Sequence, residues 1–406
     1  MSNRTVLIVH QGSMSRGGYW HTHGFFEIVK DENMLREIHD EFEYRPQGRQ
    51  PIGIGKVNIK VVGVGGGGSN AVNRMYSDPI DTVDYIVMNT DAQALELATV
   101  PTGLRVGDTT ARGMGVGGDP SQGRICHEEN REEIAEALDG ADLVFVTAGM
   151  GGGTGTGGAP VVAQIAKQLG ALTIGVCTMP FGFEGTHRTA KAEEGVAELQ
   201  KYVDTLIRIP NDRLLDAAAP DTTTQEAWRM ADKVLKDGVE GIARVIIEPG
   251  EVNLDFADVR AVMTNAGPAW MGVGQASDSE PGGALDAVQQ ALESPLLDVD
   301  ITGAQRALVN ITGGPSMRMY SVQEISSIVQ SKMTSQSNII LGTARQANMG
   351  PNIRVIVIAT GFPTDEEQRM MDTKMIEKAI EDPDSMKIPP FLRNHMMQLE
   401  KRGRQF

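Results

Sequence analysis

Cysteine is nearly absent from this chain of 406 residues, which contains only Cys126 and Cys177. Neither has the cysteine or histidine spacing of a zinc site or a disulfide framework, so both classes are excluded. The chain also lacks an uninterrupted run of about 18 apolar residues and a basic-then-apolar leader pattern. We therefore expect a cytoplasmic protein that does not insert into membranes.

Basic residues are in deficit, with 37 Lys and Arg against 53 Asp and Glu and a net charge of −16. Such a charge repels nucleic acid and anionic lipid, so any membrane contact should run through an adaptor. Apolar residues make up 40% and charged residues 22%, which is typical of a globular protein. The length is sufficient for two domains, each with its own core.

The most informative stretch is residues 149–158, Gly-Met-Gly-Gly-Gly-Thr-Gly-Thr-Gly-Gly. It follows an apolar strand pattern at 143–147 and precedes a helical pattern at 159–169. Backbone N–H groups in such a turn, together with a helix N-terminus, bind phosphate. The stretch has no lysine, which excludes the common GxxxxGK[ST] loop. A flexible linker would not be bracketed by two apolar elements.

A second glycine-rich loop, residues 63–70, follows a strand pattern at 57–64 and opens a helix that runs to Tyr76. It satisfies GxGxxG, and Asp91 follows the next strand, so a nicotinamide-dependent oxidoreductase is the first rival interpretation. A third glycine-rich turn at 113–120 favours a triphosphate over a pyrophosphate.

Two further strand patterns, 172–178 and 205–209, complete an alternation of strands and helices over residues 56–210. This alternation predicts a parallel sheet covered on both faces. Glu184 and Arg188 follow the first of these strands, where ligands bind in such sheets. The same two side chains, one helical turn apart, also fit a simple surface ion pair.

The apolar spacing at 224–247 predicts a long helix between the two domains. Asp255 and Asp258 then open a further helix. From periodicity alone, helix capping is favoured over catalysis for this pair.

The predicted fold class is α/β, a parallel-sheet (Rossmann-like) domain joined by a long central helix to an α+β C-terminal domain. The last domain has strand patterns at 307–312, 339–342 and 354–360 and helical patterns at 284–293 and 322–332. Residues 363–386 are acidic, and the apolar residues of the basic tail are typical of a docking peptide. The predicted boundaries are 1–55 (N-terminal extension), 56–222 (nucleotide-binding domain), 223–248 (central helix), 249–362 (C-terminal domain), 363–386 (acidic linker) and 387–406 (tail).

Several of these motifs resemble those of one family. Residues 151–157 are similar to the signature loop of the tubulin/FtsZ superfamily, and five further segments resemble the FtsZ family of bacterial cell-division GTPases in particular. Those segments are 63–72, 89–95, 183–188, 209–213 and 253–259. Residues 387–393 are similar to the adaptor-binding motif that this family has and tubulins lack.

The resemblance implies that the chain binds GTP and GDP, with Mg²⁺ or K⁺ as an accompanying cation. On the matching positions, Asn211 and Asp232 would read the guanine edge and Trp228 would lie near the base. Glu184 and Arg188 would lie on the ribose and phosphate side. The remaining nucleotide-binding residues would be Gly66, Gly67, Asn70, Gly117, Gly118, Gly152, Gly153, Thr154, Gly155 and Thr156.

The resemblance also implies that Asp255 and Asp258 are catalytic, acting on the nucleotide of a neighbouring copy, with no metal site formed by one chain alone. The protein would then be a GTPase that assembles head to tail into filaments of the division ring. A membrane-tethering adaptor would bind Ile388, Pro389, Phe391, Leu392 and Arg393. A filament scaffold that binds GTP with little hydrolysis is the alternative.

Two positions depart from the family pattern. Asp119 stands where asparagine is usual, which we expect to add negative charge near the phosphates. Gly118 replaces a common alanine and should loosen its loop.

Overall fold

The computed structural model describes residues 57–362, apart from 217, 220, 248–254, 280–281, 294–300 and 335–336. The predicted N-terminal extension, acidic linker and tail lie outside the described residues. Within the described part, no helix combines the length and the apolar character that crossing a membrane requires.

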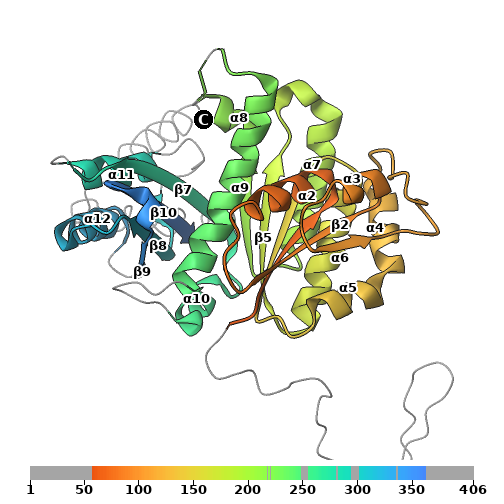
Figure 1. The fold of residues 1–406 in the computed structure, drawn as a ribbon, viewed down its shortest axis with the longest axis horizontal. Helices are drawn as coiled ribbons and strands as arrows, with labels where there is room; N and C mark the ends of the chain where they lie inside the picture. The colour runs from red at the N-terminus through yellow and green to blue at the C-terminus, as the bar shows by residue number, and fades with distance from the viewer. Residues whose placement is uncertain are drawn as a thin grey trace, which may run out of the picture. The chain divides into compact units, whose positions relative to one another are not determined.

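Ten strands and eleven α-helices make up the described fold (Figure 1). The strands are β1 (Ile59–Val64), β2 (Val83–Asn89), β3 (Thr102–Arg105), β4 (Leu143–Gly149), β5 (Leu172–Met179), β6 (Thr205–Pro210), β7 (Gly267–Ser277), β8 (Arg306–Gly313), β9 (Asn338–Arg345) and β10 (Asn352–Thr360). The helices are α2 (Gly65–Met75), α3 (Ala92–Glu96), α4 (Pro120–Glu129), α5 (Arg131–Leu138), α6 (Thr154–Gln168), α7 (Thr186–Gln200), α8 (Asn211–Asp216), α9 (Thr224–Ile247), α10 (Phe256–Met263), α11 (Gly283–Leu292) and α12 (Met319–Lys332). Short 3₁₀ turns lie at Gly182–Glu184, Ile301–Gly303 and Ala347–Met349.

All ten strands belong to one sheet, in the order β3-β2-β1-β4-β5-β6-β7-β10-β8-β9. The pairs from β3 to β7 are parallel, as the alternating pattern predicts. Beyond β7 the sheet is mixed, because β10 runs antiparallel to both β7 and β8. The predicted fold class, a parallel-sheet α/β domain joined by a long central helix to an α+β C-terminal domain, is confirmed.

Helices cover both faces of the sheet. In β1, Ile59 and Val61 pack toward α2 and α9, whereas Val62 and Val64 pack toward α4, α5, α6 and α7. Every residue of β5 is buried, which explains why its sequence is mostly apolar and has no charged residue. In the C-terminal domain, α11 and α12 cover one face of β8 and β10.

Helix α9 packs against both halves of the sheet. Its apolar side shares one buried cluster with Phe145 of β4 and with Leu308 and Ile356 of the C-terminal strands. The predicted central helix, 224–247, is confirmed to the residue. Each half also has a buried cluster of its own, one among α4, α5, α6 and α7 and one under α11 and α12, so the cluster around α9 is a third that the two halves share.

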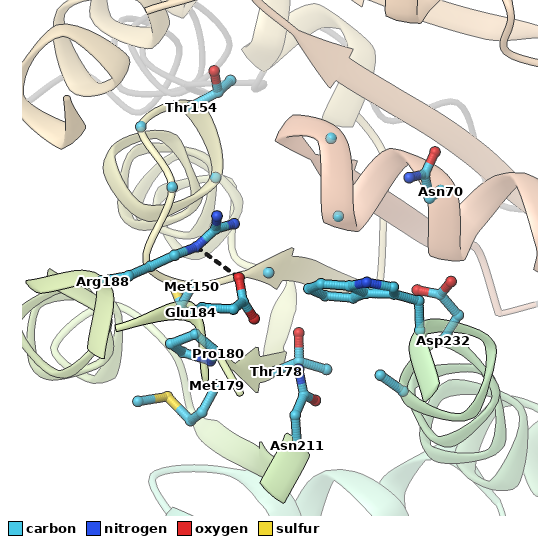
Figure 2. Close-up of a pocket in the computed structure, with 18 of the residues that line it drawn as sticks. Asn70, Met150, Thr154, Thr178, Met179, Pro180, Glu184, Arg188, Asn211 and Asp232 are labelled. Atoms are coloured by element: carbon cyan, nitrogen blue, oxygen red, sulfur yellow. Dashed lines mark ion pairs between the residues drawn. The ribbon is translucent and has the colours of Figure 1, made fainter. Parts of the chain in front are cut away.

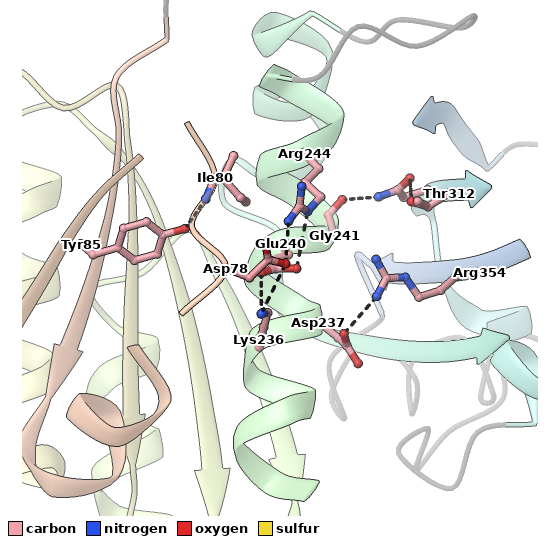
Figure 3. Close-up of polar contacts among 11 residues, drawn as sticks. Asp78, Ile80, Tyr85, Lys236, Asp237, Glu240, Gly241, Arg244, Thr312 and Arg354 are labelled. Carbon is pink, nitrogen blue, oxygen red and sulfur yellow. Dashed lines mark hydrogen bonds and ion pairs between the residues drawn. The ribbon is translucent and has the colours of Figure 1, made fainter. Parts of the chain in front are cut away.

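Polar contacts also join α9 to the C-terminal domain (Figure 3). The buried Asn310 Nδ2 donates to the carbonyl of Gly241 at 2.8 Å. Arg354 Nη1 lies 3.4 Å from Asp237 Oδ1, and both side chains are largely buried. Burial raises the pKa of Asp237, while Arg354 opposes that rise. This hydrogen bond and ion pair fix the rotation of α9 against the C-terminal strands.

Three of the seven glycines of the stretch 149–158 lie in α6, which begins at Thr154, five residues before the predicted start. A Cβ on Gly157 would lie 2.0 Å from the Pro120 carbonyl, and one on Gly158 would overlap the His127 ring. Glycine at 157 and 158 therefore allows α4 to pack against α6. Only residues 150–153, before α6, form an open turn.

We predict an energetic coupling between Gly241 of α9 and Ile356 of β10. A Cβ on Gly241 would lie 2.8 Å from Ile356 Cδ1, the atom that Ile356→Val removes. Ile356→Val alone should cost about 1 kcal/mol. The double variant Gly241→Ala/Ile356→Val should be about 1 kcal/mol more stable than the sum of the single effects, measured by urea unfolding. Strict additivity would contradict this packing.

Candidate functional site

A hollow of about 490 Å³ lies at the carboxyl ends of β1, β4, β5 and β6 (Figure 2). Ligands bind at this edge of parallel sheets, because the following loops and helix N-termini converge there. Twelve of the predicted nucleotide-binding residues line the hollow. They are Gly66, Gly67, Asn70, Gly152, Gly153, Thr154, Gly155, Glu184, Arg188, Asn211, Trp228 and Asp232.

Two helices begin at the hollow without a capping side chain. Helix α2 starts after Val64 and α6 after Gly153, and neither has an acidic residue in its first turn. By contrast, Asp91 caps the start of α3 by accepting from two backbone N–H groups. The first N–H groups of α2 and α6 have no acceptor within their helices. Both helix ends therefore offer donors and positive dipole ends to an anion.

The glycines at these two helix starts fall into two kinds. Gly65 has a φ of +68°, and a Cβ there would lie 2.6 Å from the amide nitrogen of Gly155, so protein packing requires glycine. Gly66 and Gly152 have ordinary φ values, and a Cβ on either would meet no protein atom within 4 Å. Both line the hollow, so a group that approaches the backbone closely accounts for glycine at these positions.

The charged side chains of the hollow are arranged in two ion pairs. Arg188 Nε lies 3.0 Å from Glu184 Oε2, as the spacing of the two residues predicts. Arg74 of α2 pairs with Asp232 of α9. Since two arginines are matched by two acids, the lining side chains carry no net charge. An anion here must be held chiefly by the backbone donors of α2 and α6.

The end of the hollow near α8 and α9 offers an aromatic ring and hydrogen-bond acceptors. Trp228 is 41% exposed and meets the buried Phe181 edge to face at 5.1 Å. Asn211 is 2% exposed, and its Oδ1 has no hydrogen-bond partner among the described residues. Figure 2 shows Asn211 and Asp232 well separated from Thr154 at the start of α6. A flat base with N–H donors fits this end.

The Asp232 carboxyl has a pKa raised from 3.8 to about 6. Burial is the larger cause, because removing a carboxylate from water disfavours its charged form, and the positive charge of Arg74 opposes the rise. The side chain is 13% exposed. A buried charged acceptor is thus maintained inside the hollow at a cost in folding free energy.

Three predicted nucleotide-binding residues do not line the hollow, namely Gly117, Gly118 and Thr156. Thr156 is buried, and its Oγ1 accepts from the N–H of Gly151 at 2.9 Å. Gly117 and Gly118 have positive φ values in the turn before α4. That turn packs against Gly153. A Cβ on Gly153 would lie 2.5 Å from Val116 Cγ2.

Asp119 likewise lies outside the lining, in contrast to the expectation of a charge near the phosphates. It caps α4, accepting from the N–H and the Oγ of Ser121 at 2.9 and 2.7 Å. These hydrogen bonds hold the pKa of Asp119 below its usual value.

Asp255 and Asp258, the predicted catalytic pair, lie outside the hollow of their own chain. Asp255 Oδ1 accepts from the N–H of Asp258 at 2.8 Å, and Asp258 Oδ2 accepts from the N–H of Asp255 at 3.3 Å. This reciprocal capping box starts α10, and both side chains are exposed. The five predicted adaptor-binding residues, 388, 389 and 391–393, lie outside the described residues.

Seven lining residues were not predicted from the sequence: Arg74, Gly149, Met150, Thr178, Met179, Pro180 and Ala231. Residues 178 and 179 end β5 and residue 180 follows it, so the rule that ligands bind at strand carboxyl ends could have identified them. Arg74 follows Asn70 by one helical turn on the same face of α2, a spacing that also could have identified it.

Comparison with known proteins gives two family matches. Residues 58–219 match the model described as "Tubulin/FtsZ family, GTPase domain", and residues 267–363 match "FtsZ family, C-terminal domain". Among solved structures, an empty FtsZ dimer from M. jannaschii is 39% identical, with a TM-score of 0.73, covering 81% of this chain and 92% of that one. A GTPγS-bound protofilament of CetZ2 from Haloferax volcanii is 22% identical with a TM-score of 0.65, covering 81% of this chain and all of that one.

We predict that Asp232→Asn stabilises the ligand-free protein above pH 6. Because the folded-state pKa of Asp232 is raised, the folded protein binds the proton more tightly, and stability falls as pH rises from about 4 to about 6. The variant should therefore gain about 2 kcal/mol at pH 7.5 and almost nothing at pH 4, measured by urea unfolding. An equal effect on stability at both pH values would contradict a raised pKa of the Asp232 carboxyl.

Proposed function

Because this chain belongs to the FtsZ family of the tubulin/FtsZ GTPases, we propose that it polymerises head to tail and hydrolyses GTP at the interface between subunits. The observation that carries the proposal is the convergence of two uncapped helix N-termini on one hollow without net side-chain charge. Such a site holds a polyphosphate through backbone donors instead of a lysine.

In this proposal the phosphates lie against the starts of α2 and α6, near Gly66, Gly152 and the Thr154 hydroxyl. The base lies beside Trp228. The Asp232 carboxylate accepts from both N1–H and the 2-amino group of guanine, a donor pair that adenine lacks. Both acids in the hollow are engaged by arginines. A Mg²⁺ ion that accompanies the nucleotide would therefore be held by phosphate oxygens rather than by these carboxylates.

Hydrolysis requires a group that orients water near the γ-phosphate. Within the described lining, Glu184 and Asp232 are the acids, and each is paired with an arginine. We therefore assign this role to Asp255 and Asp258 of a second copy, whose exposed carboxylates open α10. Self-association is supported by the dimer and the protofilament named among the similar structures.

The nicotinamide alternative has less support. A dinucleotide enzyme of this fold uses the acid after the second strand to bind a ribose. Here that acid, Asp91, caps α3 and does not line the hollow. A competition assay in which NAD⁺ displaced bound nucleotide more effectively than GTP would favour this alternative.

The cellular part of the proposal is a filament at the division site. The sequence of residues 387–393, Lys-Ile-Pro-Pro-Phe-Leu-Arg, supports attachment to a membrane-tethering adaptor. Pull-down of a membrane-bound division protein by the full chain, lost when residues 387–406 are deleted, tests this attachment.

We predict that Gly152→Ala weakens GTP binding without unfolding the protein. The added methyl group meets no protein atom but projects into the hollow, where it would keep a phosphate from the backbone donors. We expect the affinity to fall at least tenfold, or by about 1.4 kcal/mol, in equilibrium binding with a fluorescent GTP analogue.

Gly103→Ala of β3 is the matched control, since its Cβ would make ordinary contacts of 3.7 Å or more, away from the hollow. It should bind GTP as the wild type does. Wild-type affinity in Gly152→Ala would contradict a phosphate at the start of α6.

We predict that Asp258→Asn retains GTP-dependent filaments but releases phosphate at least a hundredfold more slowly. Asparagine keeps the acceptor that caps the N–H of Asp255 but loses the charge that polarises water. Phosphate release and light scattering should be measured across protein concentrations, with thermal unfolding as the test of capping.

For the wild type, the rate per molecule should rise steeply above a critical concentration. Equal rates in Asp258→Asn and the wild type that do not depend on protein concentration would leave only the alternative function, a GTP-binding scaffold with little hydrolysis. The capping box favours that alternative, because it gives both carboxylates a role within their own chain.

A further inference from the structure

Arg74 occupies a place in the hollow that the proposed nucleotide contacts do not use. It lies on α2 one helical turn beyond Asn70, and its Nη1 forms an ion pair with Asp232 Oδ2 across the gap to α9. Both residues line the hollow. The ion pair therefore joins the two helices at the end where the base is proposed to bind.

The surroundings of Asp232 distinguish Arg74 from the other nearby cations. A smaller hollow of about 270 Å³ adjoins the first and is lined by Arg74, Arg229, Asp232, Lys233 and Lys236. Lys236 lies 3.4 Å from Glu240 and 4.0 Å from Asp78. Arg229 and Lys233 lie on the exposed side of α9. Among the described residues, Arg74 is the cation whose guanidinium contacts the Asp232 carboxylate.

The proposed base contact depends on the ionisation of Asp232. A carboxylate can accept two hydrogen bonds, from N1–H and from the 2-amino group of guanine. A protonated carboxyl carries an O–H donor and loses part of that acceptor capacity. Guanine and hypoxanthine differ by the 2-amino group, so discrimination between them reports on the ionised acceptor.

We propose that Arg74 is a positioning residue that determines specificity, an inference that rests on the proposed function. Its ion pair keeps Asp232 ionised and oriented to accept hydrogen bonds from guanine. Arg74 acts through Asp232 and does not itself contact the base. Its side chain is 44% exposed, so it can be changed without opening a buried cavity.

The electrostatics of the pair agree with this role. Burial raises the pKa of Asp232 to about 6, and Arg74 is the charge that limits the rise. Removing that charge moves the pKa further upward, toward neutral pH. Without Arg74, a substantial fraction of Asp232 is protonated at the pH at which the wild-type carboxyl is fully ionised.

The test compares the dissociation constants of GDP and IDP from pH 5.5 to 8.5, in the wild type and in Arg74→Gln. The two nucleotides carry the same phosphates, so the ratio of their constants cancels any effect of Arg74 on phosphate binding. We expect the wild-type preference for GDP to be constant above pH 7 and to decline near pH 6. In Arg74→Gln the midpoint of the decline should move upward by about one pH unit.

Three further variants complete the design. Arg74→Lys keeps the charge and should restore the wild-type midpoint. Asp232→Asn should have a preference that does not change with pH in this range. Arg105→Gln removes an arginine from an exposed ion pair with Asp108, outside the hollow, and should leave the midpoint unchanged.

A midpoint in Arg74→Gln equal to that of the wild type would overturn the inference. If Arg74→Gln did not fold, as judged by circular dichroism, a preference that still changed with pH in Asp232→Asn would overturn it instead. Absence of guanine nucleotide binding to the wild type at every pH would refute the proposed function itself, which distinguishes the two failures.

Discussion

The functional architecture depends on the first backbone N–H groups of α2 and α6, which have no acceptor within their own helices. Helices α2 and α6 begin where β1 and β4 end, and no side chain caps either of them. Parallel pairing of β1 with β4 places the two helix starts side by side. Because a lining without net charge adds little attraction for anions, the affinity of this site for phosphate has to come from the backbone.

Helix α9 connects the site to the C-terminal domain. Asp232 lines the hollow, and five residues later on the same helix Asp237 pairs with Arg354 of β10. The carbonyl of Gly241 accepts from Asn310 of β8 one turn further on. A base bound at one end of α9 therefore contacts the same rigid element that holds the C-terminal strands. The next described helix along the chain is α10, whose two aspartates act on a second copy in the proposed filament.

Sequence patterns were sufficient for the elements that are apolar and regular. β5 is buried throughout and α9 has a continuous apolar stripe, and both were predicted within a residue or two. β7 was missed because it is interrupted by glycines. One of them, Gly274, lets α11 approach so closely that a Cβ would lie 2.0 Å from the Ala287 carbonyl. Such a requirement arises only after the domain has packed.

In the site, too, local motifs could be predicted from the sequence, whereas contacts that depend on packing could not. Seven of the twelve predicted lining residues lie in motifs that repeat a local geometry, a strand followed by a glycine turn and a helix. Glu184 and Arg188 follow the end of a strand, whereas Asn211, Trp228 and Asp232 were assigned only through the family resemblance. Arg74 was missed although its spacing from Asn70 places it on the same face of α2, and its pairing with Asp232 forms only when α2 packs beside α9. Gly117 and Gly118 were expected near the phosphates because of the family resemblance. In the structure that turn supports Gly153 from behind and does not line the hollow.

The central claim is that the backbone N–H groups at the starts of α2 and α6 hold the phosphates. Amide NMR spectra of glycine-labelled protein, titrated with GDP and separately with guanosine, test it most directly. The account predicts that GDP shifts the amide resonances of Gly66, Gly67 and Gly155, whereas guanosine, which lacks phosphates, leaves them nearly unchanged. Equal shifts with both ligands, or no shift of these resonances at saturating GDP, would contradict it.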